Sequence, residues 1–224
     1  MRINIAIDGP GAAGKSTIAK RLAKKLNYVH LDTGAMYRST AYKAVKNNIA
    51  LDDEEALCNM LSNTDITLTP EGKVYLDQQD VTSLIRTDEI SLAASQVSKL
   101  ANVRSMLVKR QQDMAKDKGF IMDGRDIGTV VLKDAEVKIY MTASAMARAQ
   151  RRYDQNIAQS IPCESVEQIA KEIAQRDMQD MTRKNSPLKK ADDAIEIDTS
   201  NMSVEQVTDT IYAYAKPFLE KEVH

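Results

Sequence analysis

The clearest chemistry in the sequence lies in eight residues near the N-terminus. They are Gly9-Pro10-Gly11-Ala12-Ala13-Gly14-Lys15-Ser16, and they match G-x-x-x-x-G-K-[ST] at every fixed position. The glycines let backbone N–H groups turn toward a phosphate, and the helix that follows adds partial positive charge. Lys15 would reach the β- and γ-phosphates of a nucleotide, and the Ser16 hydroxyl could bind Mg²⁺. The motif predicts a nucleotide-binding loop but does not define the reaction.

A second candidate is a short apolar run that ends in an acid, Phe120-Ile121-Met122-Asp123. The terminal acid of such a strand organises Mg²⁺ or its waters in many nucleotide-binding proteins. Because apolar residues followed by Asp are common, this pattern is weak by itself. The sequence has no N-K-x-D guanine-reading motif, which lowers the GTPase alternative.

Arginines gather near these segments although the chain is charge-balanced, with 31 basic and 32 acidic residues and a net charge of -1. Such a balance argues against broad binding to nucleic acid or to an anionic membrane. Arginine forks bind phosphate oxygens bidentately, and two phosphates can meet in line only inside fixed positive charge. Each arginine alone could instead lie on a solvated helix face. The candidates are Arg38, Arg104, Arg125, Arg148, Arg151, Arg152, Arg176 and Arg183.

The sequence has only two histidines and shows no Ser/His/Asp or Cys/His arrangement that would supply a general base. None is needed when the attacking group is already a phosphate oxygen, so phosphoryl transfer between two nucleotides is favoured. Cys58 and Cys163 lack metal-type spacing and are interpreted as reduced thiols. No apolar run approaches the roughly 18 residues of a membrane span, and the N-terminus lacks a signal sequence. We therefore expect a cytoplasmic protein.

Apolar patterns place these residues on an α/β framework. Ile3, Ile5 and Ile7 predict a buried strand before the loop, and a four-residue repeat predicts a helix over Lys15–Leu26. Alternation about Thr69–Lys73 predicts a β-hairpin over 64–81. Further strands are expected at 28–31, 119–123, 137–141 and 194–197, and helices at 35–46, from 88, at 101–116, from 144, at 164–184 and from 203. The predicted fold is a doubly wound parallel sheet with helices on both faces.

The sequence resembles the bacterial cytidylate kinases from the first strand to about residue 220. Five blocks carry the resemblance: Gly9 to Thr17, Asp32-Thr33-Gly34-Ala35-Met36-Tyr37-Arg38, Ile85-Arg86-Thr87 with Ala94-Ser95-Gln96-Val97, Asp123-Gly124-Arg125-Asp126-Ile127-Gly128-Thr129-Val130-Val131, and Arg176-Asp177-x-x-Asp180-x-x-Arg183. The second, fourth and fifth blocks are specific, because adenylate and guanylate kinases do not share them in this form.

The resemblance implies a monomeric enzyme that transfers phosphate from ATP or dATP to CMP or dCMP, with Mg²⁺ bound at Ser16 and with small-molecule partners only. It implies a P-loop kinase core at 1–62 and 105–224, a helical lid at about 148–185, and an inserted nucleoside-monophosphate-binding subdomain at 63–104. The implied ATP-binding residues are Gly9, Pro10, Gly11, Ala12, Ala13, Gly14, Lys15, Ser16 and Thr17.

The resemblance also implies roles for single residues. Ser95 and Arg104 match positions that read the cytosine edge, with Asp126 close by, and Arg176 and Asp180 match positions that hold the sugar hydroxyls. The acceptor-phosphate positions are Thr33, Tyr37, Arg38 and Arg125. The implied catalytic set is Lys15, Arg125, Arg148, Arg151, Arg152 and Arg183. A kinase of another small acceptor, such as UMP, AMP or shikimate, and a non-catalytic nucleotide sensor remain as alternatives.

Overall fold

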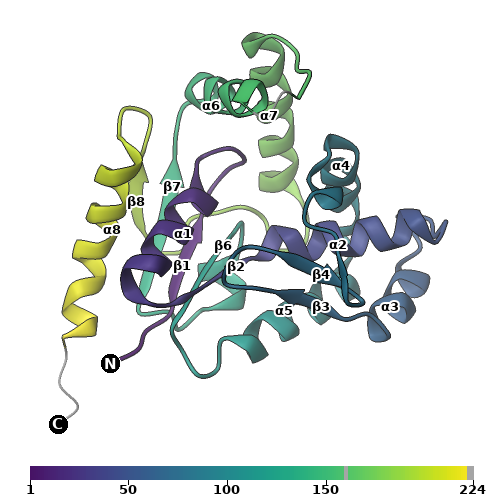
Figure 1. Ribbon diagram of the computed structural model, residues 1–224, viewed down its shortest axis with the longest axis horizontal. Coiled ribbons are helices and arrows are strands. Elements are labelled where there is room, and N and C mark those ends of the chain that lie inside the picture. The colour runs from purple at the N-terminus through teal and green to yellow at the C-terminus, as the bar shows by residue number, and fades with distance from the viewer. Residues whose placement is uncertain (159–160, 221–224) are drawn as a thin grey trace. The chain divides into compact units, whose positions relative to one another are not determined.

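The computed structural model describes residues 1–158 and 161–220. The elements, labelled in Figure 1 where there is room, are β1 (Ile5–Asp8), α1 (Lys15–Leu26), β2 (Val29–Asp32), α2 (Thr33–Lys46), α3 (Glu54–Ser62), β3 (Ile66–Leu68), β4 (Val74–Leu76), β5 (Gln79–Asp80), the 3-10 helix η1 (Leu84–Arg86), α4 (Asp88–Val97), α5 (Ala101–Met114), β6 (Phe120–Gly124), the π-helix η2 (Ile127–Val131), β7 (Val137–Thr142), α6 (Ala145–Ala158), α7 (Val166–Thr182), β8 (Ile195–Asp198) and α8 (Val204–Leu219). The chain forms two compact units. The first is Met1–Tyr28 with the described residues from Lys118 onward, and the second is Val29–Asp117.

The first unit is built on parallel strands in the order β6-β1-β7-β8. Ile5 of β1 is in register with Ile121 of β6 and with Val137 of β7. All four residues of β1 are buried, as a strand between two parallel neighbours requires, and this explains its continuous apolar sequence. The predicted α/β class with a parallel sheet is confirmed.

Helices α1 and α8 pack together in the core of this unit (Figure 1). Ile18 and Leu22 of α1 and Ile211 of α8 join the strand isoleucines in a single buried cluster. Each such side chain contributes on the order of 2 kcal/mol when it leaves water. Ser203 caps α8 in a capping box with Gln206, so the predicted start of this helix is confirmed.

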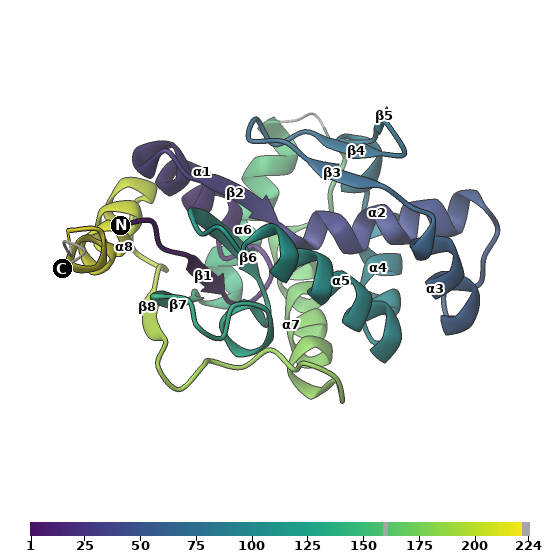
Figure 2. The same cartoon turned by 90° about the horizontal axis from the view of Figure 1, so that it is seen from below.

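The second unit contains α2, α3, α4, α5 and a small antiparallel sheet in the order β3-β4-β5, which Figure 2 shows from below. Ile66 pairs with Leu76 and Leu68 with Val74, and the turn between the strands is closed by a hydrogen bond from Thr69 N to Lys73 O at 3.0 Å. The predicted hairpin is confirmed. The predicted boundaries of a core and an insertion at 63–104 stay a prediction, and residues 159–160 and 221–224 of that division lie outside the described residues.

The other predicted strands and helices are found within a few residues of their expected bounds. Four elements were not predicted: helix α3, strand β5, the 3-10 helix η1 and the π-helix η2. In the described ranges no helix is both long enough and apolar enough to cross a membrane.

Candidate active site

The glycine-rich loop leaves β1 through a close backbone contact. Gly9 has φ +148°, and a Cβ on it would lie 2.1 Å from the Met141 carbonyl oxygen of β7, so no other residue fits. Gly14 then begins α1 in the left-handed region at φ 91°, without a side-chain cap and without an acidic residue in the first turn. The positive end of α1 is therefore not neutralised by its own side chains, as anion binding requires.

Lys15 lies inside this loop and is 6% exposed. Its Nζ donates to the Pro10 carbonyl oxygen at 2.7 Å. Burial, reinforced by the charge of Arg125, lowers the pKa of Lys15 to about 7, although the carboxylates of Asp123, Asp8 and Asp180 oppose the shift. A polyphosphate at this loop would replace part of the lost hydration and stabilise the charged form of the lysine.

The Ser16 hydroxyl donates to Asp123 Oδ2 at 2.7 Å, which joins the loop to the end of β6. Hydroxyl and carboxylate oxygens are the ligands that Mg²⁺ prefers, and Mg²⁺ in nucleotide sites usually takes one or two protein ligands plus phosphate oxygens. In residues 1–158 and 161–220 no group of three or more His, Cys, Asp or Glu side chains could hold a metal ion. Ser16 and Asp123 therefore fit a nucleotide-bound Mg²⁺ better than a resident metal cage.

The segment after β6 brings predicted site residues together. Arg125 Nε donates to Asp180 Oδ2 of α7 at 2.9 Å, and the Arg125 guanidinium lies next to Gly11. Arg183 lies 3.8 Å from Asp180 and 4.0 Å from Asp126. Burial alone would raise the pKa of Asp180, but the neighbouring guanidinium of Arg125, with Arg183 and Arg176, brings that pKa below its ordinary value. The cluster is thus an ionised carboxylate within a ring of fixed cations.

Asp8 is a site residue that the sequence reasoning missed. Its two carboxylate oxygens accept from the backbone N–H groups of Ile127 and Gly128, each at 2.7 Å, so it fixes the chain directly after Asp126. Burial raises the pKa of Asp8 to about 6, the two backbone N–H groups lower it, and nearby Asp126 raises it. The available signal was an acid at the carboxyl end of a buried parallel strand, where ligands of α/β proteins bind.

The arginines of α6 differ in their contacts. Arg148 donates to Gly11 O at 3.0 Å and to Ala143 O at 2.9 Å, and Arg151 donates to Ala13 O at 3.4 Å and to Thr199 Oγ1 at 3.1 Å. Arg152 is half-buried and makes no hydrogen bond or ion pair within residues 1–158 and 161–220. Of the three arginines of α6 in the implied catalytic set, Arg148 and Arg151 therefore contact the phosphate-binding loop itself.

Asp177 of α7 is the second missed residue. One oxygen accepts from Gly11 N at 3.4 Å, and the other lies 2.6 Å from Arg148 Nη1. The side chain belongs to the Arg176-Asp177-x-x-Asp180 block, and the three-residue spacing placed it one turn from Asp180 on the same helix face. The sequence block therefore included Asp177 but did not indicate that Asp177 contacts the loop.

Predicted acceptor residues of the second unit form two groups. Asp32 caps α2, and its Oδ2 lies 3.7 Å from Arg38 Nη1 and 3.2 Å from Arg86 Nη2. Thr33, the next residue, is buried. Arg104 stacks 5.2 Å above the ring of Tyr37 and donates to Ser98 O at 3.0 Å. Ser95 is buried on α4. The remaining predicted residues, Arg125, Asp126, Arg176 and Asp180, belong to the first unit.

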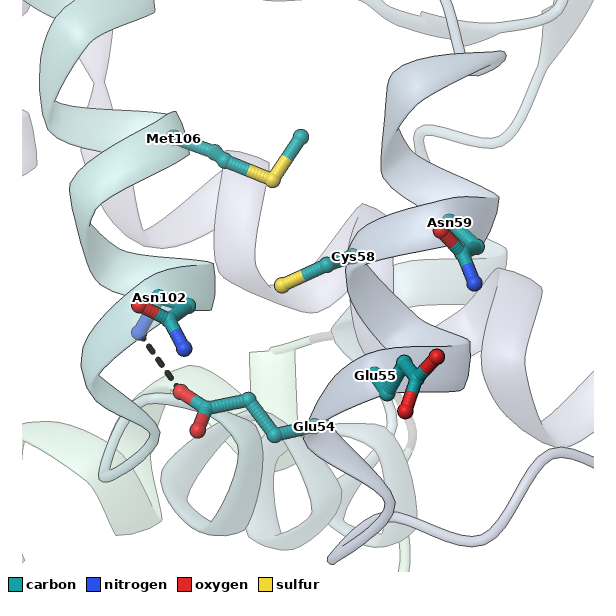
Figure 3. Close-up of a pocket in the computed structure, with 6 residues that line it drawn as sticks. All are labelled: Glu54, Glu55, Cys58, Asn59, Asn102 and Met106. Carbon is teal, nitrogen blue, oxygen red and sulfur yellow. Dashed lines mark hydrogen bonds between the residues drawn. The ribbon is translucent and has the colours of Figure 1, made fainter.

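A groove between α3 and α5 contains none of the predicted site residues (Figure 3). It is lined by Glu54, Glu55, Cys58, Asn59, Asn102 and Met106. Glu54 accepts a hydrogen bond from the Asn102 backbone, which ties the two helices together. Burial, and then the charge of Glu54, raises the pKa of the Cys58 thiol, so the nucleophilic thiolate is disfavoured.

The loop between β1 and α1, the Ser16–Asp123 pair and the arginines of α6 and α7 define the class of protein. It is a P-loop phosphotransferase. The chain belongs to the cytidylate kinase family, whose family model matches residues 5–217.

Relatives agree with this assignment, and a solved structure agrees with the fold. The chain is 52% identical over 212 residues to the cytidylate kinase of Geobacillus sp. (strain WCH70), covering 93% of this chain and 94% of that protein. It is 50% identical over 213 residues to the cytidylate kinase of Bacillus subtilis (strain 168), covering 94% and 95%. A gluconokinase from Sinorhizobium meliloti 1021 is 10% identical with a TM-score of 0.51, covering 98% of this chain and 94% of that chain, and it shares the fold alone.

Proposed function

We propose that this protein transfers the γ-phosphate of ATP or dATP to CMP or dCMP, giving ADP or dADP and CDP or dCDP. The observation that carries the proposal is the set of cations at the P-loop, where Lys15, Arg125, Arg148 and Arg151 all lie against backbone of the loop or its flanking glycines. Several cations fixed at one loop suit the transfer of a phosphoryl group between two anions. Membership of the cytidylate kinase family supports the choice of acceptor.

The residues act by position and charge. The transferring phosphoryl group spreads negative charge over its equatorial oxygens, and cations already fixed in place stabilise that charge without reorganising. Arg148 and Arg151 are fixed by backbone carbonyls, and Arg125 is fixed by Asp180. When bound, Mg²⁺ would neutralise phosphate charge, and Ser16 and Asp123 are the residues that would hold it. Removal of Mg²⁺ should therefore abolish turnover.

On the acceptor side we propose that residues 63–104 form the nucleoside-monophosphate-binding insertion, with Arg38 and Tyr37 of α2 near the acceptor phosphate. Ser95 and Arg104 would read the cytosine edge, because N3 and O2 of cytosine accept hydrogen bonds. Asp126 would accept from the 4-amino group, and Arg176 and Asp180 would bind the sugar hydroxyls. The proposal also includes a monomeric, cytoplasmic enzyme that binds neither nucleic acid nor membrane.

Initial rates of ADP formation with CMP, dCMP, UMP, AMP and shikimate, at fixed ATP and Mg²⁺, test the proposal. CMP or dCMP should give the highest kcat/KM. Lys15→Ala should remain folded and lose at least about 100-fold in turnover, because one preorganised cation at the loop is removed. A higher kcat/KM with AMP or shikimate than with CMP would mean that the enzyme uses a different acceptor. ATP binding without turnover of any acceptor would favour a nucleotide sensor.

A further inference from the structure

Three polar groups of the P-loop make contacts within the protein. Lys15 donates to Pro10 O, and Ser16 donates to Asp123. The backbone N–H of Gly11 points at a carboxylate, Asp177 Oδ1 of α7, at 3.4 Å. The first two contacts lie within the loop or join it to the neighbouring strand. In the third, a carboxylate of α7, which is distant in the sequence, accepts a hydrogen bond from a backbone N–H of the loop.

Asp177 is 7% exposed, and its second oxygen forms an ion pair with Arg148 at 2.6 Å. Arg148 in turn donates to the carbonyl oxygen of Gly11 at 3.0 Å. The Asp177–Arg148 pair therefore binds both backbone groups of the same loop residue. An inward backbone N–H and an arginine fork are the donors that a phosphate oxygen uses, and here they bind a carboxylate instead.

We infer that Asp177 is an internal placeholder for the donor phosphate, bound to Gly11 N–H and Arg148 until a triphosphate displaces it. The inference rests on the proposed function only in taking the P-loop as the donor site. Asp177 occupies these two donors without setting the place of Arg148, whose guanidinium is also held by the carbonyl oxygens of Gly11 and Ala143. Asp177 also competes with the incoming anion, both for these donors and through like-charge repulsion.

Removal of the charge should release both donors while Arg148 stays in place, since the carbonyl oxygens of Gly11 and Ala143 still accept from its guanidinium. Asp177→Asn keeps the size of the side chain and removes the charge. We expect this variant to bind ATP, and inorganic triphosphate, about tenfold more tightly than the wild type, because one charge-assisted competitor is lost. A residue with only a structural role would give the opposite change, weaker binding together with lower stability.

The test is isothermal titration calorimetry of the full chain with ATP and with inorganic triphosphate, in the absence of acceptor. Asp209→Asn is the matched control, because it removes the same charge from an exposed pair with Lys25 on the first unit, and its affinities should equal those of the wild type. Asp177→Ser is a second variant with the same expected result, should the Asn protein melt below the assay temperature. Unchanged or weaker binding in a folded Asp177 variant would overturn the inference. If the Asp177 variants bind triphosphate more tightly but the wild type does not phosphorylate CMP, the inference about Asp177 holds and only the proposed function is wrong.

Discussion

Four arginines of this protein are held in place by carboxylates or by backbone carbonyls. Arg125 is bound by the Asp180 carboxylate and Arg148 by that of Asp177, whereas Arg151 and Arg104 are held by backbone carbonyls of Thr199 and Ser98. In each case the guanidinium is oriented before any phosphate or base arrives. Preorganised charge of this kind stabilises a transition state without a reorganisation cost.

Arg104 gives a prediction about acceptor choice. Arg104→Ala should lower the ratio of kcat/KM for CMP to that for UMP by roughly tenfold, since the variant loses a donor that discriminates the two base edges. The matched control is Arg110→Ala on the same helix, because Arg110 donates to the carbonyl oxygens of Thr64 and Leu61 and is expected to be structural. Rates with both acceptors measure the ratio. An unchanged ratio in Arg104→Ala would show that Arg104 does not contact the base.

At this scale the sequence predicted the residues whose spacing is local. The G-x-x-x-x-G-K-[ST] run identified Lys15 and Ser16, and the apolar run before Asp123 identified its partner. Asp8 and Asp177 were missed because their partners are distant in the chain, 119 residues from Asp8 to Ile127 and 166 residues from Gly11 to Asp177. An isolated acid gives no sign of which backbone N–H it will bind.

Helices α6 and α7 lie side by side in Figure 1 and carry most of the charged contacts to the P-loop. The three arginines of α6 differ in how they are held. Arg148 and Arg151 are tied to the loop and to Thr199, and Arg152 contacts no polar partner in the described residues. An arginine without a polar partner among the described residues is available to a ligand, which agrees with the place of Arg152 in the implied catalytic set.

Arg152→Lys should therefore separate activity from stability. The substitution keeps the charge and loses the planar fork, so turnover should fall by at least about tenfold. The melting temperature should change by less than about 2 °C, because Arg152 makes no hydrogen bond or ion pair with the described residues that the substitution could break. Arg151→Lys is the contrasting variant: it loses the bonds to Thr199, and its melting temperature should fall further. A parallel fall of activity and melting temperature in Arg152→Lys would make that residue structural.

The elements that the sequence predicted are those with a continuous or periodic apolar pattern. Helix α3 buries only Leu57 and Leu61 in nine residues, too short a stretch for a helical period to emerge. The π-helix η2 depends on a tertiary contact, because Asp8 binds the N–H groups of Ile127 and Gly128 at its start. Local propensity cannot predict a backbone conformation that a distant carboxylate selects.

For the whole molecule, the order of strand, loop and helix predicted the parallel α/β fold, and the family relationship extends over residues 5–217. The overall charge of -1 conceals how the charges are arranged. Acids and arginines are paired inside the first unit, and one acid, Asp8, is buried with no cation among its hydrogen-bond partners. That arrangement couples the stability of the fold to pH.

The buried Asp8 should make the protein less stable as the pH rises through the weakly acidic range. Its pKa is raised from the ordinary 3.8 to about 6, so between these values the folded chain holds a proton that the unfolded chain has released. Stability therefore falls as the pH rises from about 4 to about 6 and levels off above that range. Urea unfolding from pH 4 to 7 should show the free energy of unfolding of the wild type declining relative to Asp8→Asn.

Asp193 supplies a control of opposite sign on the same unit. A hydrogen bond from Lys138 lowers the pKa of Asp193, so its contribution is present at neutral pH and is lost as the pH falls through the folded pKa. From pH 4 to 7 the difference between the wild type and Asp193→Asn should therefore stay nearly constant, and below about pH 3.8 the wild type should lose stability relative to Asp193→Asn. If the difference between the wild type and Asp8→Asn is also constant from pH 4 to 7, Asp8 is ionised in the fold well below pH 6. A falling difference would mean that the protein keeps a destabilising charge at neutral pH that binds the backbone N–H groups of Ile127 and Gly128, a compromise expected where stability and activity compete.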